Sequence, residues 1–132
     1  MTVPFRKMWN DPDQSRYRFK FDMFTETWQP KIIGQVDNMH VKIARIDGVF
    51  DWHAHAEEDE FFLVVDGTMD MEFRDRTERV ATGEMIIVPK GVEHRPASVG
   101  GECKIMMIER AGTVNTGNAT GSALTVDAPE HI

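Results

Sequence analysis

Residues 53–67 read HAHAEEDEFFLVVDG. The apolar run 61–65 has the length and composition of a buried strand, and Asp66-Gly67 after it is a strong β-hairpin signal. Before the run, His53 and His55 stand at i and i+2, positions that project to the same face of an extended chain. Both imidazoles can therefore reach one ion. A strand and a candidate metal site are thus predicted side by side.

Strand signals continue on both sides of this segment, through residues 38–110. Met69, Met71 and Phe73 alternate with polar residues, and further short runs at 39–43, 85–88, 95–99 and 103–108 are separated by turns rich in Gly and Pro. In the run 39–43, the alternation predicts that Val41 and Ile43 face the core. Short strands at a spacing of about 8–12 residues indicate an all-β sandwich or barrel.

Composition excludes several classes of protein. The 132 residues fit one domain, and the net charge of −7 argues against a nucleic-acid or anionic-membrane partner. No apolar run approaches the roughly 18 residues of a membrane span, and the first residues do not resemble a secretory signal. The single cysteine, Cys103, cannot form an internal disulfide, which fits a reducing cytosol. We therefore expect a cytoplasmic protein.

The barrel segment 38–110 lies between two segments of different composition. Residues 1–37 hold seven of the twelve aromatic residues and are expected to pack on the barrel or on a dimer partner; the seven are Phe5, Trp9, Tyr17, Phe19, Phe21, Phe24 and Trp28. The spacing of Phe21, Phe24 and Trp28 predicts a short helix near residues 20–28, ended by Pro30. The extension 111–132 loses the alternation and is expected to cross the surface before a last contact at residues 124–126.

Two further residues complete a candidate metal site. Glu60 begins the strand after the acidic loop 56–59, and the turn Pro89-x-Gly91-x-x-His94 delivers a third histidine from a later strand. Three imidazoles and one carboxylate suit a divalent transition metal, Fe, Mn, Ni, Co or Zn, better than Ca or Mg. Glu57 is the chief alternative to Glu60 as the carboxylate ligand.

These motifs resemble those of the cupin superfamily. The family's first motif, G-x5-H-x-H-x3,4-E-x6-G, is similar to Gly48-x4-His53-x-His55-x4-Glu60-x6-Gly67, which has one residue fewer after the leading glycine. Its second motif, G-x5-P-x-G-x2-H-x3-N, is similar to Gly83-x5-Pro89-x-Gly91-x2-His94-x3-Ser98. Ser98 replaces the usual asparagine, a change that concerns a strand-to-strand hydrogen bond and no metal ligand.

The resemblance implies a cupin-type double-stranded β-helix, or jelly-roll barrel, here with a short N-terminal helix. The chain is most similar to small single-domain cupins often labelled mannose-6-phosphate-isomerase-like. That label reflects the fold and is not evidence of the isomerase reaction. Cupins of this size usually pair, so a homodimer is expected.

The resemblance also implies a metal bound by His53, His55, Glu60 and His94, with Glu60 able to double as a catalytic base. We expect a metal-dependent enzyme for a small oxygenated metabolite, either isomerase- or lyase-like or a dioxygenase. The alternatives are a non-catalytic metal-assisted module that binds or senses a small ligand, and a structural role without metal. An apolar substrate pocket is expected from Trp52, Phe62, Met71, Phe73, Met85 and Met106. Lys42 is a further candidate for binding an anionic substrate.

Overall fold

The computed structural model describes residues 16–132, and the expected Phe5 and Trp9 contacts lie outside this range. Its elements are α3 (Tyr17–Lys20), η1 (Phe21–Met23), β1 (Lys31–Val36), β2 (Met39–Ile46), β3 (Glu60–Asp66), β4 (Thr68–Phe73), β5 (Thr77–Ala81), β6 (Met85–Val88), β7 (His94–Ser98) and β8 (Cys103–Arg110). No helix in this range is long and apolar enough to cross a membrane.

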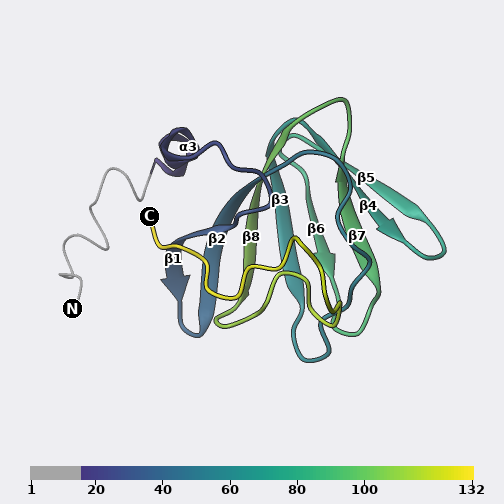
Figure 1. The fold of residues 1–132 in the computed structure, drawn as a ribbon. Helices are drawn as coiled ribbons and strands as arrows, with labels where there is room; N and C mark the ends of the chain where they lie inside the picture. The colour runs from purple at the N-terminus through teal and green to yellow at the C-terminus, as the bar shows by residue number, and fades with distance from the viewer. Residues whose placement is uncertain (1–15) are drawn as a thin grey trace.

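The strands form two sheets that face each other (Figure 1). The larger sheet has the order β1-β2-β8-β3-β6 and the smaller sheet the order β5-β4-β7. All strand pairs in both sheets are antiparallel, and buried side chains such as Phe62, Met69, Met71 and Ile105 fill the space between the sheets. This arrangement is the predicted jelly-roll, with the predicted short N-terminal helix beside it.

The chain changes sheet at Asp66-Gly67. The sequence predicted a hairpin here, and this was wrong in one respect: β3 pairs with β6 and β8, whereas β4 pairs with β5 and β7. Gly67 has φ 97°, and a Cβ atom there would lie 3.2 Å from the Cα of Cys103. Glycine is therefore needed because the corner packs directly against the backbone that enters β8.

Strand β2 is buried on both faces, contrary to the predicted alternation. Lys42, Ala44 and Ile46 face the interior, whereas Ile43 lies in a second cluster outside the larger sheet with Phe21. The prediction that Ile43 faces the main core was wrong because the segment before β1 covers the outer face of the sheet. A polar residue therefore stands on the inner face, and its position decides part of the chemistry below.

The helix predicted over residues 20–28 ends earlier, at Met23. Phe24 is extended, with φ −151° and ψ 157°, and Trp28 has φ 62°. Arg45 of β2 explains the break, because its guanidinium donates hydrogen bonds to the carbonyl oxygens of Phe21 and Phe24 at 2.7 and 3.0 Å. These bonds hold Phe21 and Phe24 on the sheet and direct the chain toward Trp28.

Ser98 makes the strand-to-strand contact that its motif position concerns. Its hydroxyl accepts a hydrogen bond from the Gly48 amide at 2.7 Å, and its own amide donates to the Gly48 carbonyl at 2.9 Å. The serine side chain, although shorter than asparagine, therefore still joins the chain before His53 to β7.

Candidate metal centre

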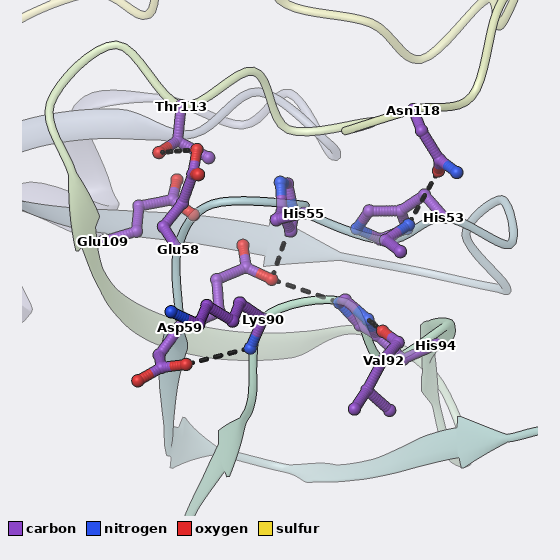
Figure 2. A network of polar contacts seen from close by, with 12 residues as sticks. His53, His55, Glu58, Asp59, Lys90, Val92, His94, Glu109, Thr113 and Asn118 are labelled. Atoms are coloured by element: carbon purple, nitrogen blue, oxygen red, sulfur yellow. Dashed lines mark hydrogen bonds and ion pairs between the residues drawn. The ribbon is translucent and has the colours of Figure 1, made fainter.

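Four buried side chains converge between the two sheets. His53 and His55 come from the segment before β3, Glu60 begins β3, and His94 begins β7. One ligand atom from each lies within 4.8 Å of the others. Figure 2 shows the three labelled imidazoles turned toward a common region. The structure thus brings together the four residues that the spacing predicted as ligands.

Backbone carbonyls fix the orientation of two of the imidazoles. The Nδ1 atom of His53 lies 2.9 Å from the Asp51 carbonyl oxygen, and that of His94 lies 2.8 Å from the Val92 carbonyl oxygen. A carbonyl oxygen only accepts, so each Nδ1 carries the proton and donates. Each Nε2 therefore presents a lone pair, which is the tautomer that a metal-binding histidine needs.

The electrostatics of the site favour a neutral His53 imidazole beside an ionised Glu60 carboxylate. Burial, with a smaller contribution from His94, lowers the pKa of His53 to about 4. Burial alone would raise the pKa of Glu60, but polar contacts with Glu109, His55 and His94 outweigh it and hold that pKa well below its usual value. Near neutral pH, His53 and Glu60 therefore have the protonation states in which they can bind a cation.

The four residues fit a divalent transition metal. The Nε2 atom of His55 is buried without a hydrogen-bond partner, and it lies 3.3 Å from Glu60 Oε1 without hydrogen-bonding angles. An unpartnered buried nitrogen is costly unless something else binds its lone pair. Ligand atoms about 2.1 Å from one ion lie at most roughly 4.2 Å apart, so the observed cluster needs only a small contraction.

Behind Glu60 lies a buried ion pair that the sequence did not reveal. Lys42 Nζ is 2.7 Å from Glu109 Oε1, and both side chains are almost wholly buried. Burial and the neighbouring carboxylate of Glu60 raise the pKa of Glu109 well above its usual value, although Lys42 opposes this. The two carboxylates therefore share one interior region with a single ammonium group, and Lys42 is bonded within the fold.

The extension 111–132 packs over the histidine segment rather than only crossing the surface. The amide of Ala54, between the two histidines, donates to the Asn118 side-chain oxygen at 2.8 Å, and the Asn118 amide donates to the Ala54 carbonyl at 3.1 Å. A Cβ atom at Gly117 would overlap that carbonyl and lie 3.2 Å from His55 Nδ1. Figure 2 shows this segment passing above the imidazoles, with Asn118 beside His53.

Two side chains fix the course of that extension. Asn115 donates to the Leu124 carbonyl at 2.9 Å and accepts from the Val126 amide at 2.8 Å, while the hydroxyls of Thr116 and Thr125 are 2.7 Å apart. The expected contact of residues 124–126 is thus made with the segment that covers the site. The density of Asn, Thr and Gly in residues 112–118 was the sequence signal for such a turn-rich cover.

A small cavity of about 40 Å³ adjoins His53 and Glu60. It extends into the barrel, and its lining is Trp28, Pro30, Ala44, Ile46, Phe50, His53, Glu60, Phe62, Pro96, Ile105, Met107 and Asn115. Sequence reasoning missed Trp28, Phe50 and Asn115 as cavity residues. The first two stack with ring centroids 4.9 Å apart, a contact between residues that no periodicity relates.

Of the six residues expected to form the pocket, Phe62 lines this cavity. Met71 lies in the main core, and Met106 packs in the outer cluster with Phe21. Phe73 and the exposed Met85 line a separate cavity between β5 and β6. Trp52 is held outside the barrel by two guanidinium groups. The centroid of its ring lies 3.9 Å from the Cζ atom of Arg74 and 4.7 Å from that of Arg95.

The acidic loop before β3 has a structural part in the site. Asp59 accepts a hydrogen bond from the Lys90 amide at 2.9 Å (Figure 2). The next amide, that of Gly91, donates to the His55 carbonyl at 2.7 Å. Glu58 accepts from the Thr113 hydroxyl at 3.0 Å. Glu57, the alternative ligand, is exposed and lies outside the cluster of four.

Comparison with known proteins assigns the chain to one family. The model of the Cupin_2 family, described as a cupin domain, matches residues 39–109. The uncharacterized protein YdbB of Bacillus subtilis is 34% identical over 67 residues, which are 50% of this chain and 59% of that protein. The match therefore spans less than two thirds of that relative.

Solved structures similar to this chain agree with the family assignment. A cupin-2 domain containing protein from Shewanella frigidimarina has a TM-score of 0.70 at 40% identity, covering 74% of this chain and 98% of that one. Protein NMB1881 from Neisseria meningitidis has a TM-score of 0.65 at 32% identity, covering 71% and 95%. Both similarities extend over most of the barrel.

Proposed function

The chain belongs to the cupin family, and from this membership we propose that it is a metal-dependent enzyme acting on a small oxygenated metabolite. The reaction is of the isomerase or lyase type, or an oxygenation by O2. The observation that carries the proposal is the buried cluster of His53, His55, Glu60 and His94 beside a cavity. Polar side chains that served only to pack the core would have hydrogen-bond partners for all their buried atoms. Here the His55 Nε2 atom has none, and a cavity adjoins the cluster.

The ion would act as a Lewis acid toward an oxygen donor or, if it is iron, support redox chemistry with O2. The protein's own residues do the rest. The Asp51 and Val92 carbonyls orient the imidazoles of His53 and His94, and the apolar cavity wall excludes water from the ligand.

Glu60 is the group we assign to proton transfer. Among the described residues that line the cavity it is the one carboxylate, so it can accept a proton from a ligand bound there. Glu60→Gln, which keeps the size of the side chain, is expected to lower turnover more than it lowers metal content. A Glu60→Gln protein with normal metal and full activity would contradict this role.

Elemental analysis of protein purified without oxygen is the decisive first experiment. About one transition-metal ion per chain is expected, with loss of the ion in a His94→Gln variant. Iron together with substrate-dependent oxygen uptake would support the oxygenase reaction. Zinc, manganese, cobalt or nickel with interconversion of isomers would support the isomerase reaction.

The alternative is a module that binds or senses a small ligand through the metal without turnover. The small, largely apolar cavity favours a binding module, because few groups in its lining other than Glu60 are placed for acid–base chemistry. Tight ligand binding with no product under either set of conditions would select this alternative. Metal-free protein after gentle purification would contradict both functions.

We further propose that the chain works in the cytoplasm as a homodimer. The single, buried cysteine supports the first part, because a chain without an internal disulfide needs no oxidising compartment. A mass of about twice 15.1 kDa by light scattering at micromolar protein is expected for the second part. A monomeric mass would contradict it.

A further inference from the structure

The wall of the cavity beside the four ligands offers a ligand almost no hydrogen bonds. Apart from His53 and Glu60, Asn115 is the polar side chain among the described residues that line it. The indole nitrogen of Trp28 is already bonded to the Asp47 carbonyl at 3.0 Å. Buried hydroxyl groups without partners are costly, so a polyhydroxylated sugar would lose more in this cavity than it gained.

The cavity also lacks a cation for a second negative charge. No Lys or Arg of residues 16–132 lines it. Lys42 is bonded to Glu109 at 2.7 Å, and Arg45 is bonded to the carbonyls of Phe21 and Phe24 and to the Glu102 carboxylate. A divalent ion beside the ionised Glu60 carries about one net positive charge, which is enough for one anionic donor but leaves a phosphate group unpaired.

The size of the ligand is limited by Trp28. The cavity encloses about 40 Å³, more than one water needs but well below the roughly 150 Å³ that admits benzene. The Trp28 ring stacks on Phe50 at its wall, with a centroid separation of 4.9 Å. Its backbone has φ 62°, in the left-handed region, and its amide donates to the Arg45 carbonyl at 2.8 Å.

A tryptophan in the left-handed region is unfavourable and persists only where its surroundings hold it there. Here the Arg45 and Asp47 carbonyls bind both its amide and its indole nitrogen. The strained backbone therefore keeps Trp28 in the wall of the cavity. A position that needed only a turn would be filled at lower cost by glycine.

We infer that this site takes a small, largely apolar molecule that carries at most one negative charge and presents one or two neighbouring oxygen donors, and that Trp28 sets its upper size. The inference rests on the proposed function, because the donors would bind the ion held by the four ligands. It excludes phosphorylated and polyhydroxylated sugars as the ligand. Trp28 is thus a specificity-determining residue, whereas the Asn115 side chain is already bonded to Leu124 and Val126.

The test uses the full chain loaded with Co²⁺, whose visible absorption reports a change of ligands. Three probes share one hydroxy-ketone donor pair: hydroxyacetone, dihydroxyacetone phosphate and 2-hydroxyacetophenone. Hydroxyacetone is expected to change the spectrum, and dihydroxyacetone phosphate to bind at least about tenfold more weakly because its phosphate finds no cation. The aromatic probe is expected not to bind the unmodified chain.

Removing the indole should change the size limit alone. Trp28→Ala and Trp28→Gly are both expected to admit 2-hydroxyacetophenone. The glycine variant also relieves the backbone strain of the positive φ, so it keeps the test available if the alanine variant is unstable. Trp52→Ala is the matched control, since Trp52 lies outside the barrel between Arg74 and Arg95. It should exclude the aromatic probe as the unmodified chain does.

The possible failures are distinct. If Co²⁺ does not bind, the proposed function fails and this inference with it. If Co²⁺ binds and no probe changes the spectrum, or the phosphorylated probe binds as tightly as hydroxyacetone, the inference about the ligand is overturned and the metal site stands. Binding of the aromatic probe to the unmodified chain, or exclusion by a folded Trp28 variant, overturns the role of Trp28.

Discussion

Gly117 lies so close to Ala54 that a side chain of one methyl group would overlap the Ala54 carbonyl oxygen. Ala54 is the residue between His53 and His55, so the C-terminal extension touches the backbone that positions both imidazoles. The extension is therefore coupled to the candidate metal centre through direct contact. This coupling can be tested with a single methyl group.

Gly117→Ala is expected to destabilise the fold and to weaken metal binding, because the added Cβ displaces either the extension or the Ala54 carbonyl. Gly121→Ala is the matched control: Gly121 also has a positive φ, 70°, but its Cβ would meet nothing within 4 Å. The control should lose about 1 kcal/mol from backbone strain and keep its metal affinity. Urea unfolding and metal titration measure the two effects, and equal behaviour of the two variants would refute the coupling.

The buried Lys42–Glu109 pair predicts a double-mutant result. Glu109→Leu removes the carboxylate 2.7 Å from the Lys42 ammonium and leaves it the hydrogen bond of 3.5 Å to the Thr113 carbonyl oxygen, so a loss of roughly 3–5 kcal/mol in the free energy of unfolding is expected. Adding Lys42→Met should recover most of that loss, because the ammonium that lost its Glu109 partner is removed as well. Removing Asp70 from its exposed pair with Arg79 should have little effect. A double variant as unstable as the single one would contradict this account.

Cys103 is predicted to be unreactive in the folded chain. Burial, with a contribution from Asp66, raises its pKa from 9.0 to about 11, so little thiolate forms at pH 8. A disulfide reagent should label it at least about tenfold faster in urea. Because the unfolded thiol ionises first, its contribution to stability is complete below pH 9.0 and is lost as the pH rises toward 11. Cys103→Ala should lack this alkaline loss.

Replacing a ligand histidine should remove the metal without abolishing the fold. His94→Gln is expected to lower metal affinity more than about 100-fold, since loss of even an outer partner costs roughly 10–100-fold. His131→Gln is the control, because His131 contacts His40 away from the cluster. Affinity measured by competition with a chelating dye decides the matter. Equal affinities in the two variants would rule out His94 as a ligand.

The sequence predicted what depends on local spacing. His53 and His55 share a face of an extended segment, and the turn before His94 has a fixed length, so the cluster followed from short distances along the chain. Lys42 could not be placed in this way, because alternation assumes that polar residues face water. Its partner, Glu109, is 67 residues away, and only the strand order brings them together.

The residues that line the cavity could not be predicted from the sequence for a related reason. Trp28 lines it through a backbone conformation with φ 62° that helical periodicity cannot represent, and it meets Phe50 across the edge of the barrel. The hairpin signal at Asp66-Gly67 correctly predicted a turn but not that the turn joins two sheets. Local chemistry set the bend, and tertiary packing against Cys103 set its direction.

The origin of the ligands in two sheets has a mechanical consequence. Glu60 begins a strand of the larger sheet and His94 a strand of the smaller one, 34 residues later. An ion held by both would act as a reversible cross-link that closes a loop containing β4, β5 and β6, and so restrict the unfolded chain as a disulfide does. In a chain with one thiol, the ion would take over that stapling role, and chelation would loosen the smaller sheet first.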